Sequence, residues 1–165
     1  MTEPFVVYQG TFDPFTQGHL AILKNALSLF GSVRVLLLVN PDKQPLFSLQ
    51  ERKEMIALAT AGLAGVSIDS DSGLLVDYMR AHAVTRCVRG VRDEADASYE
   101  MKNHALSQQL YPALQTLLLS CDPALKEISS SRVKEACMQG HVPKEWICQQ
   151  TLPFLRRKFP QVQFI

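Results

Sequence analysis

Four short segments of the chain carry glycines, hydroxyls and cations in arrangements suited to holding phosphate groups. The first, residues 10–19 (GTFDPFTQGH), runs through a proline-containing turn to Gly18 and His19. An apolar helical pattern follows, so His19 falls in a first helical turn, where free amides and the positive dipole end favour an anion. The segment matches neither G-x-G-x-x-G nor G-x-x-x-x-G-K-[ST], which argues against a dehydrogenase and a P-loop NTPase. Taken alone, His19 is more simply explained as a structural histidine.

A lysine in one loop and a serine run in another add further phosphate ligands. Lys43 lies between Pro41 and Pro45, which stiffen the loop, although a single lysine is ordinarily just an exposed side chain. Residues 128–134 (ISSSRVK) place three serines at the start of a helical pattern. Those serines can cap the free amides of the helix or donate hydroxyls to phosphates.

Two arginines complete the set. Arg89 and Arg92 lie three residues apart at the end of an apolar run, on either side of Gly90 and Val91. Because guanidinium groups stay charged and bind phosphate through planar forks, the pair can reach two separate phosphates, while Gly90 permits close backbone approach. Salt bridges to the acidic stretch 93–96 are the alternative. No Ser-His-Asp, Cys-His or paired-carboxylate motif is evident, which favours catalysis by positioning and positive charge.

An alternation of strands and helices must position these segments. Apolar runs predict buried strands at residues 5–8, 33–39, 66–68, 85–88 and 116–119. Apolar spacing predicts helices at 18–30, 49–63, 74–83 and 96–110, the second beginning with a capping box of Ser48 and Glu51. Five strands joined by crossover helices predict an α/β fold, a Rossmann-like doubly wound five-stranded parallel sheet with helices on both faces. Its ligand site is expected at the carboxyl ends of the strands.

Composition limits the classes of function. With 165 residues, 47% hydrophobic and 20% charged, the chain is expected to form a single domain over residues 1–165, with a short helical extension from about 143. A net charge of +1 gives no overall attraction to nucleic acid or to membranes. Neither a leader sequence nor an apolar run of about 20 residues is evident, so we expect a cytoplasmic protein. The four cysteines lack metal or redox spacing, which predicts reduced, mostly buried thiols: Cys87, Cys121, Cys137 and Cys148.

In order and spacing, the segments resemble those of a known enzyme family. Residues 16–19 (TQGH) match the T/H-x-G-H motif of the nucleotidyltransferase superfamily, and residues 128–134 match its I-S-S-S/T-x-x-K/R motif, with Lys134 as the trailing cation. Within it, the similarity is greatest to the bacterial phosphopantetheine adenylyltransferase family. Further blocks agree over about residues 5–146, at 40–52, 72–78, 88–92, 99–100 and 128–135.

The resemblance implies transfer of the adenylyl group of ATP to 4′-phosphopantetheine, giving dephospho-coenzyme A and pyrophosphate. It also implies Mg²⁺ held mainly through the ATP phosphates, a homohexamer, and coenzyme A as a candidate feedback ligand. Two alternatives stay open at this stage. One is a nucleotidyltransferase for another phosphorylated acceptor, and the other is a non-catalytic nucleotide- or coenzyme A-binding relative.

The resemblance also assigns roles to individual residues. Those implied in catalysis are His19, Lys43 and Arg92. Those implied in ATP binding are Gly10, Thr11, Phe12, His19, Gly90, Val91, Arg92, Glu100, Leu125, Ile128, Ser129, Ser130 and Ser131. Those implied in phosphopantetheine binding are Thr11, Lys43, Leu75 and Arg89. The simpler alternatives are an exposed helix carboxylate for Glu100 and a core position for Leu75.

The chain departs from the family pattern at several positions. Gln44 replaces a second lysine, and Ser107 replaces an asparagine of the acceptor site. Residues 97–98 (Ala-Ser) replace an aromatic residue and a carboxylate. Leu125 replaces the aromatic ring that would stack on adenine, which leaves apolar contact without stacking. These departures affect contacts to the base and to the pantetheine arm rather than to the phosphates.

Overall fold

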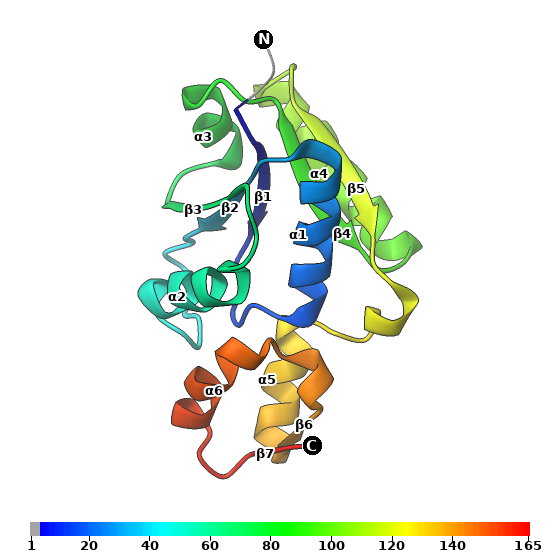
Figure 1. Cartoon of the computed structure of the whole chain (residues 1–165). Helices are drawn as coiled ribbons and strands as arrows, with labels where there is room; N and C mark the ends of the chain where they lie inside the picture. Colours follow the sequence, from blue (N-terminus) through cyan, green and yellow to red (C-terminus); the bar gives the residue numbers. More distant parts are fainter. Residues whose placement is uncertain (1–3) are drawn as a thin grey trace.

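A computed structural model describes residues 4–165 and contains a five-stranded parallel sheet with strand order β3-β2-β1-β4-β5 (Figure 1). The strands are β1 Val6–Gly10, β2 Val33–Leu38, β3 Val66–Asp71, β4 Arg86–Val91 and β5 Gln115–Ser120. The connecting helices are α1 Gln17–Phe30, α2 Leu49–Thr60, α3 Leu75–Ala81 and α4 Glu94–Leu110. The predicted Rossmann-like, doubly wound sheet is confirmed.

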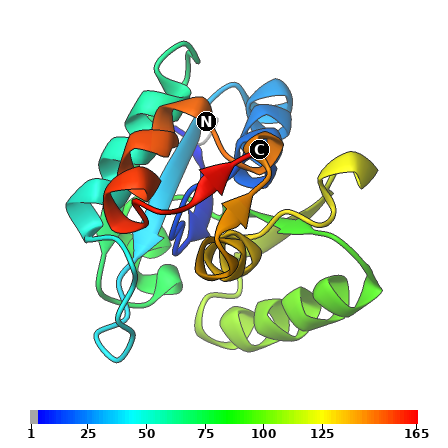
Figure 2. The ribbon, with the colours of Figure 1, turned by 90° about the horizontal axis from the view of Figure 1, so that it is seen from below.

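Alternating side chains of the central strand pack into two cores, one on each face of the sheet. Val6 and Tyr8 pack in the core that includes α1 and α2. Val7 packs in the core that includes Met79 of α3. Viewed from below, α1 and α2 lie on one side of the sheet and α4 on the other (Figure 2). Because both faces are covered, the inner strands β1 and β2 read as largely apolar runs, which is why the sequence revealed them.

The element boundaries differ from the predicted ones where polar residues take part in regular structure. β3 continues to Asp71, three residues beyond the predicted end, because its backbone stays paired with β2 up to Leu38. α4 begins at Glu94, because the Asp93 side chain accepts a hydrogen bond from the Asp96 amide and caps the helix there. The capping box of α2 is confirmed by reciprocal bonds between Ser48 and Glu51, at 2.8 and 3.1 Å.

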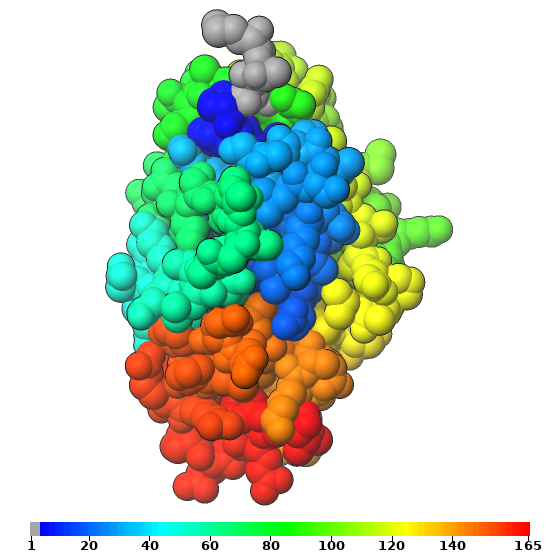
Figure 3. Space-filling view, viewed as in Figure 1, coloured from blue at the N-terminus to red at the C-terminus, as the bar shows by residue number. Residues whose placement is uncertain are grey.

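The C-terminal part lies beyond the carboxyl ends of the strands and forms the lower end of the molecule (Figure 3). It contains α5 Ser130–Gln139, α6 Leu152–Lys158 and a small parallel sheet of β6 His141–Val142 and β7 Gln163–Phe164. Short 3-10 helices span Pro123–Leu125, Lys144–Trp146 and Gln149–Thr151. A third core, here called the C-terminal core, joins this part to the segment before α2 and to α2 itself: Phe47, Met55, Val133, Ala136, Cys137, Val142, Ile147, Phe154, Leu155 and Phe164.

Phe47 tests how firmly the C-terminal core is joined to the rest of the fold. Its ring is fully buried among α5, α6 and α2. We expect Phe47→Ala to lower the free energy of unfolding by about 3–5 kcal/mol, because it leaves a cavity in a packed core. Urea unfolding would measure the change, with Leu29→Ala on the exposed face of α1 as a control. A loss of unfolding free energy no larger than in that control would show that Phe47 does not stabilise the packing of the C-terminal core against the rest of the fold.

The cysteines agree with the sequence-based expectation of free, mostly buried thiols. All four are free; Cys87, Cys137 and Cys148 are buried, and Cys121 is partly exposed. Burial raises the pKa of the Cys137 thiol to about 11 and that of Cys148 to about 12. Within residues 4–165, no helix combines the length and apolar character needed to cross a membrane.

Candidate active site

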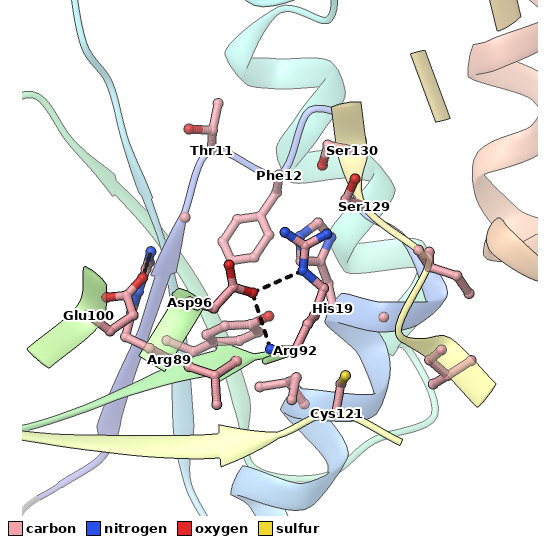
Figure 4. A pocket seen from close by; sticks show the side chains of 18 of the residues that line it. Thr11, Phe12, His19, Arg89, Arg92, Asp96, Glu100, Cys121, Ser129 and Ser130 are labelled. Carbon is pink, nitrogen blue, oxygen red and sulfur yellow. Dashed lines mark hydrogen bonds and ion pairs between the residues drawn. The ribbon is translucent and has the colours of Figure 1, made fainter. Parts of the chain in front are cut away.

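A cavity of about 370 Å³ opens at the carboxyl edge of the sheet, where β1, β4, α4 and the start of α5 meet (Figure 4). It gathers all the residues predicted to bind ATP except Ser131: Gly10, Thr11, Phe12, His19, Gly90, Val91, Arg92, Glu100, Leu125, Ile128, Ser129 and Ser130. We call it the nucleotide cavity. The predicted phosphate-binding segments 10–19 and 128–134, which are far apart in the chain, therefore line the same cavity.

His19 is held by an unusual capping box at the start of α1. The backbone N–H of Thr16 donates to Nδ1 of His19 at 3.0 Å, and the His19 amide donates to Oγ1 of Thr16 at 3.4 Å. Histidine thus takes the place that glutamate or glutamine usually occupies in this motif. A ring nitrogen that accepts a backbone N–H carries no proton, so the neutral ring carries its proton on Nε2.

The surroundings keep that ring neutral. Burial, and then the positive charges of Arg89 and Arg92, lower the pKa of His19 from 6.5 to about 4. Phe15 stacks on the ring at a centroid distance of 5.5 Å, and Phe12 meets it edge-on at 5.0 Å. His19 is therefore equipped to donate a hydrogen bond from Nε2 at neutral pH, rather than to supply a proton as an imidazolium.

The lowered pKa has a consequence for stability against pH. Between pH 6.5 and about 4 the unfolded chain binds a proton at His19 that the folded chain does not. The stability associated with this residue is therefore complete above pH 6.5 and is lost as pH falls toward 4. In urea unfolding at about pH 7 and pH 4.5, we expect the wild type to lose more stability than His19→Asn. Equal losses of unfolding free energy in the two proteins would contradict the lowered pKa of His19.

The two arginines are fixed by carboxylates of α4. Arg89 donates from Nη2 to Glu100 at 2.8 Å and from Nη1 to the carbonyl oxygen of Gln9 at 2.8 Å. Its Nε is buried without a partner among residues 4–165, an arrangement that folded proteins seldom accept. Arg92 donates from Nε to Asp96 at 3.0 Å (Figure 4). The alternative of a salt bridge to the stretch 93–96 is therefore correct for Arg92. The alternative that Glu100 is an exposed helix carboxylate is wrong, because the residue is only 8% exposed.

The serine segment caps α5 and also contacts the first loop. Ser129 accepts a hydrogen bond from the Arg132 amide at 3.2 Å, as a plain helix cap would. Ser130 donates to the carbonyl oxygen of Pro14 at 2.8 Å. A Cβ at Gly18 would lie 3.3 Å from the carbonyl oxygen of Ile128, so a side chain there would push the two segments apart. Glycine in T-x-G-H therefore permits the close approach of the two motifs.

A second cavity of about 390 Å³ adjoins the first and contains a separate group of cations, Lys43, Arg52 and Lys134. Ser131 lies here rather than in the nucleotide cavity, and Thr11 and Ser130 line both cavities. A third cavity, of about 340 Å³, contains Leu75 and Arg89.

The structure therefore divides the predicted phosphopantetheine residues among adjoining spaces. Lys43 lies in the second cavity and Leu75 in the third, while Arg89 lines the first and the third. Leu75 is partly buried and packs beside the core that contains Met79. This position fits both a contact with the pantetheine arm and a place at the edge of the core.

Several lining residues were not singled out as ligands from the sequence. In the nucleotide cavity they include Asp96, Tyr99 and Cys121. Asp96 belongs to the acidic stretch that was expected to pair with the arginines, and its i,i+4 spacing to Arg92 singles it out there. Cys121 could have been found from its place directly after β5. Of the departures from the family pattern, Leu125 lines the nucleotide cavity and Ser107 the third cavity, while residues 97–98 line neither.

Fold and site together define a protein of the nucleotidyltransferase class. A family model described as cytidylyltransferase-like matches residues 7–136. A phosphopantetheine adenylyltransferase of Thermotoga neapolitana is 39% identical over 155 residues, covering 94% of this chain and 96% of the relative. One of Brucella anthropi is 37% identical over 158 residues, covering 93% and 96%. The chain belongs to the phosphopantetheine adenylyltransferase family of cytidylyltransferase-like proteins, which confirms the resemblance seen in its motifs.

Solved structures agree on the fold. A bifunctional NMN adenylyltransferase/ADP ribose pyrophosphatase from Francisella tularensis superposes with a TM-score of 0.70 at 20% sequence identity. The match covers 93% of this chain and 48% of that one, so this chain spans about half the length of the bifunctional protein. At this identity the likeness concerns the architecture alone.

Proposed function

We propose that this chain transfers the adenylyl group of ATP to 4′-phosphopantetheine, giving dephospho-coenzyme A and pyrophosphate. A phosphate oxygen of the acceptor attacks the α-phosphorus of ATP, and the bond from that phosphorus to the bridging oxygen breaks as pyrophosphate leaves with the electron pair. The observation that carries the proposal is that His19 lines one cavity with Arg92 and Ser130, while its Nδ1 accepts the Thr16 amide and leaves Nε2 to donate.

The chemistry needs positive charge and positioning more than proton transfer. A phosphate monoester has a second pKa of about 6, so the acceptor is largely a dianion at neutral pH and needs no general base. In the transition state, His19 donates its Nε2 proton in a hydrogen bond to a non-bridging α-phosphate oxygen. Arg92 and the start of α5 receive the β- and γ-phosphates. Arg89 and Lys43 hold the acceptor phosphate. Thr11 lines both the nucleotide cavity, which contains Arg89, and the second cavity, which contains Lys43.

The arrangement of carboxylates fits Mg²⁺ held mainly through the ATP phosphates and water. Within residues 4–165 no group of three His, Cys, Asp or Glu side chains could hold a metal ion. The two carboxylates beside the nucleotide cavity, Asp96 and Glu100, are already engaged by arginines. Mg²⁺ prefers phosphate and water oxygens and would neutralise part of the phosphate charge.

Four other features remain predictions. Length and composition predict a single domain over residues 1–165 with an extension from about 143, and a cytoplasmic location. The family resemblance predicts a homohexamer and coenzyme A as a feedback ligand. Analytical ultracentrifugation would test the hexamer. Calorimetric titration of the purified protein with coenzyme A would test whether coenzyme A is a ligand.

Pyrophosphate release tests the proposed activity. The protein is incubated with Mg-ATP and, in separate reactions, 4′-phosphopantetheine, nicotinate mononucleotide, glycerol phosphate or no acceptor. We expect release with 4′-phosphopantetheine alone. Release with a different acceptor would move the assignment to that substrate, and binding of ATP without release under any condition would indicate a non-catalytic relative.

A further inference from the structure

Asp13, in the loop between β1 and α1, joins three segments of the site through one buried carboxylate. The residue is 2% exposed. Its Oδ1 accepts from the Phe47 amide at 2.9 Å, and its Oδ2 accepts from the Leu46 amide at 2.8 Å and from Lys134 Nζ at 3.1 Å. Two of these donors end the loop that carries Lys43, residues 40–47, and the third comes from α5.

Arg52 holds the same loop from its other side. It is 3% exposed and donates from Nε to the carbonyl oxygen of Phe47 at 3.1 Å and from Nη1 to that of Thr11 at 2.9 Å. Burial lowers the pKa of Arg52, and the negative charge of Asp13 opposes that shift. The end of the Lys43 loop is thus clamped, with its amides on Asp13 and its carbonyl on Arg52.

Lys134 contributes to the clamp through its ion pair with Asp13. It lines the second cavity and not the nucleotide cavity, and its side chain is 36% exposed. The family motif makes this residue the trailing cation of the serine segment. In this chain its ammonium points to Asp13 of the first loop.

We propose that Asp13 and Lys134 are positioning residues for the acceptor side of the reaction, with Lys134 acting through Asp13 on the Lys43 loop rather than through contact with ATP. The inference rests on the proposed function for the identity of the two substrates. Its physical basis is that the Asp13 carboxylate is held at once by the Lys134 ammonium and by the Leu46 and Phe47 amides, so the loss of Lys134 removes one of the three groups that fix its position. Without Lys134, Asp13 binds the Leu46 and Phe47 amides less firmly, and Lys43 loses its fixed position.

Steady-state kinetics of Lys134→Met separate this role from a direct one. We expect the KM for 4′-phosphopantetheine to rise about tenfold and the KM for ATP to change less than about twofold. Lys134→Arg, which keeps the charge, is expected to retain most of the wild-type KM. Arg132→Met removes a cation from the same helix, whose partner is Glu127, and should leave both KM values unchanged. A rise in the KM for ATP alone would overturn the proposal.

Hydrogen exchange gives a readout that needs no substrate. The amides of Leu46 and Phe47 are expected to exchange about tenfold faster in Lys134→Met and faster still in Asp13→Asn, with Arg132→Met unchanged. Unaltered exchange in Lys134→Met would overturn the proposal, whatever the enzyme's activity. Faster exchange in a protein that shows no turnover with 4′-phosphopantetheine would leave the clamp in place and refute the proposed function instead.

Discussion

Replacing His19 by asparagine is expected to lower kcat by about 100-fold or more, with a smaller effect on ATP binding. Such a loss is typical when one hydrogen-bond donor to a developing oxyanion is removed. Asparagine can still accept the Thr16 amide, as Nδ1 does now, but places no donor where Nε2 lies. The variant therefore removes the proposed hydrogen bond to the α-phosphate and keeps the helix cap.

Two further variants show whether the loss comes from the cap or from the chemistry. His19→Ala removes both, so it should match the asparagine variant in kcat and lose about 1 kcal/mol more stability. His141→Asn changes an exposed histidine of β6 and should leave kcat unaltered. ATP affinity can be measured separately by calorimetry. A kcat within threefold of the wild-type value in His19→Asn would show that His19 is structural.

Much of the fold could be predicted because its signals are local and repeated. The run 33–39 is apolar except for Arg34, as expected for an inner strand covered on both faces, and β2 follows it closely. The Ser48 capping box fixes the start of α2 from the sequence alone. The end of β3 was missed because Asp69 and Asp71 are polar, and only pairing with β2 keeps them in the strand.

The sequence predicted which residues gather at the site, but not how they divide among the three cavities. Parallel strands bring their carboxyl ends to one edge, so His19 and Arg92 were expected together and lie in one cavity. The separation of Lys43 from Arg89 depends on side-chain direction, which motif order does not contain. Asp13 was not singled out from the sequence, because its partners lie 33, 34 and 121 positions away along the chain.

Lys43→Ala is expected to lower kcat/KM for 4′-phosphopantetheine by about 100-fold, while the Kd for ATP changes less than about twofold. Lys43 is exposed at the second cavity, and within residues 4–165 no ion pair engages its ammonium. Its charge is therefore free to meet an acceptor phosphate. Because Gln44 follows it where the family usually has lysine, no neighbouring cation in the loop can substitute.

The free ammonium also makes this variant informative, since its removal leaves no buried partner behind and should leave the melting temperature unchanged. A lower kcat/KM in a fully stable protein then reports on substrate alone. Lys102→Ala, on the exposed side of α4 and outside all three cavities, is the matched loss of one positive charge and should keep full activity. A fall in ATP affinity with normal use of the acceptor would instead place Lys43 on the nucleotide, and Arg89 would then be left to hold the acceptor phosphate without it.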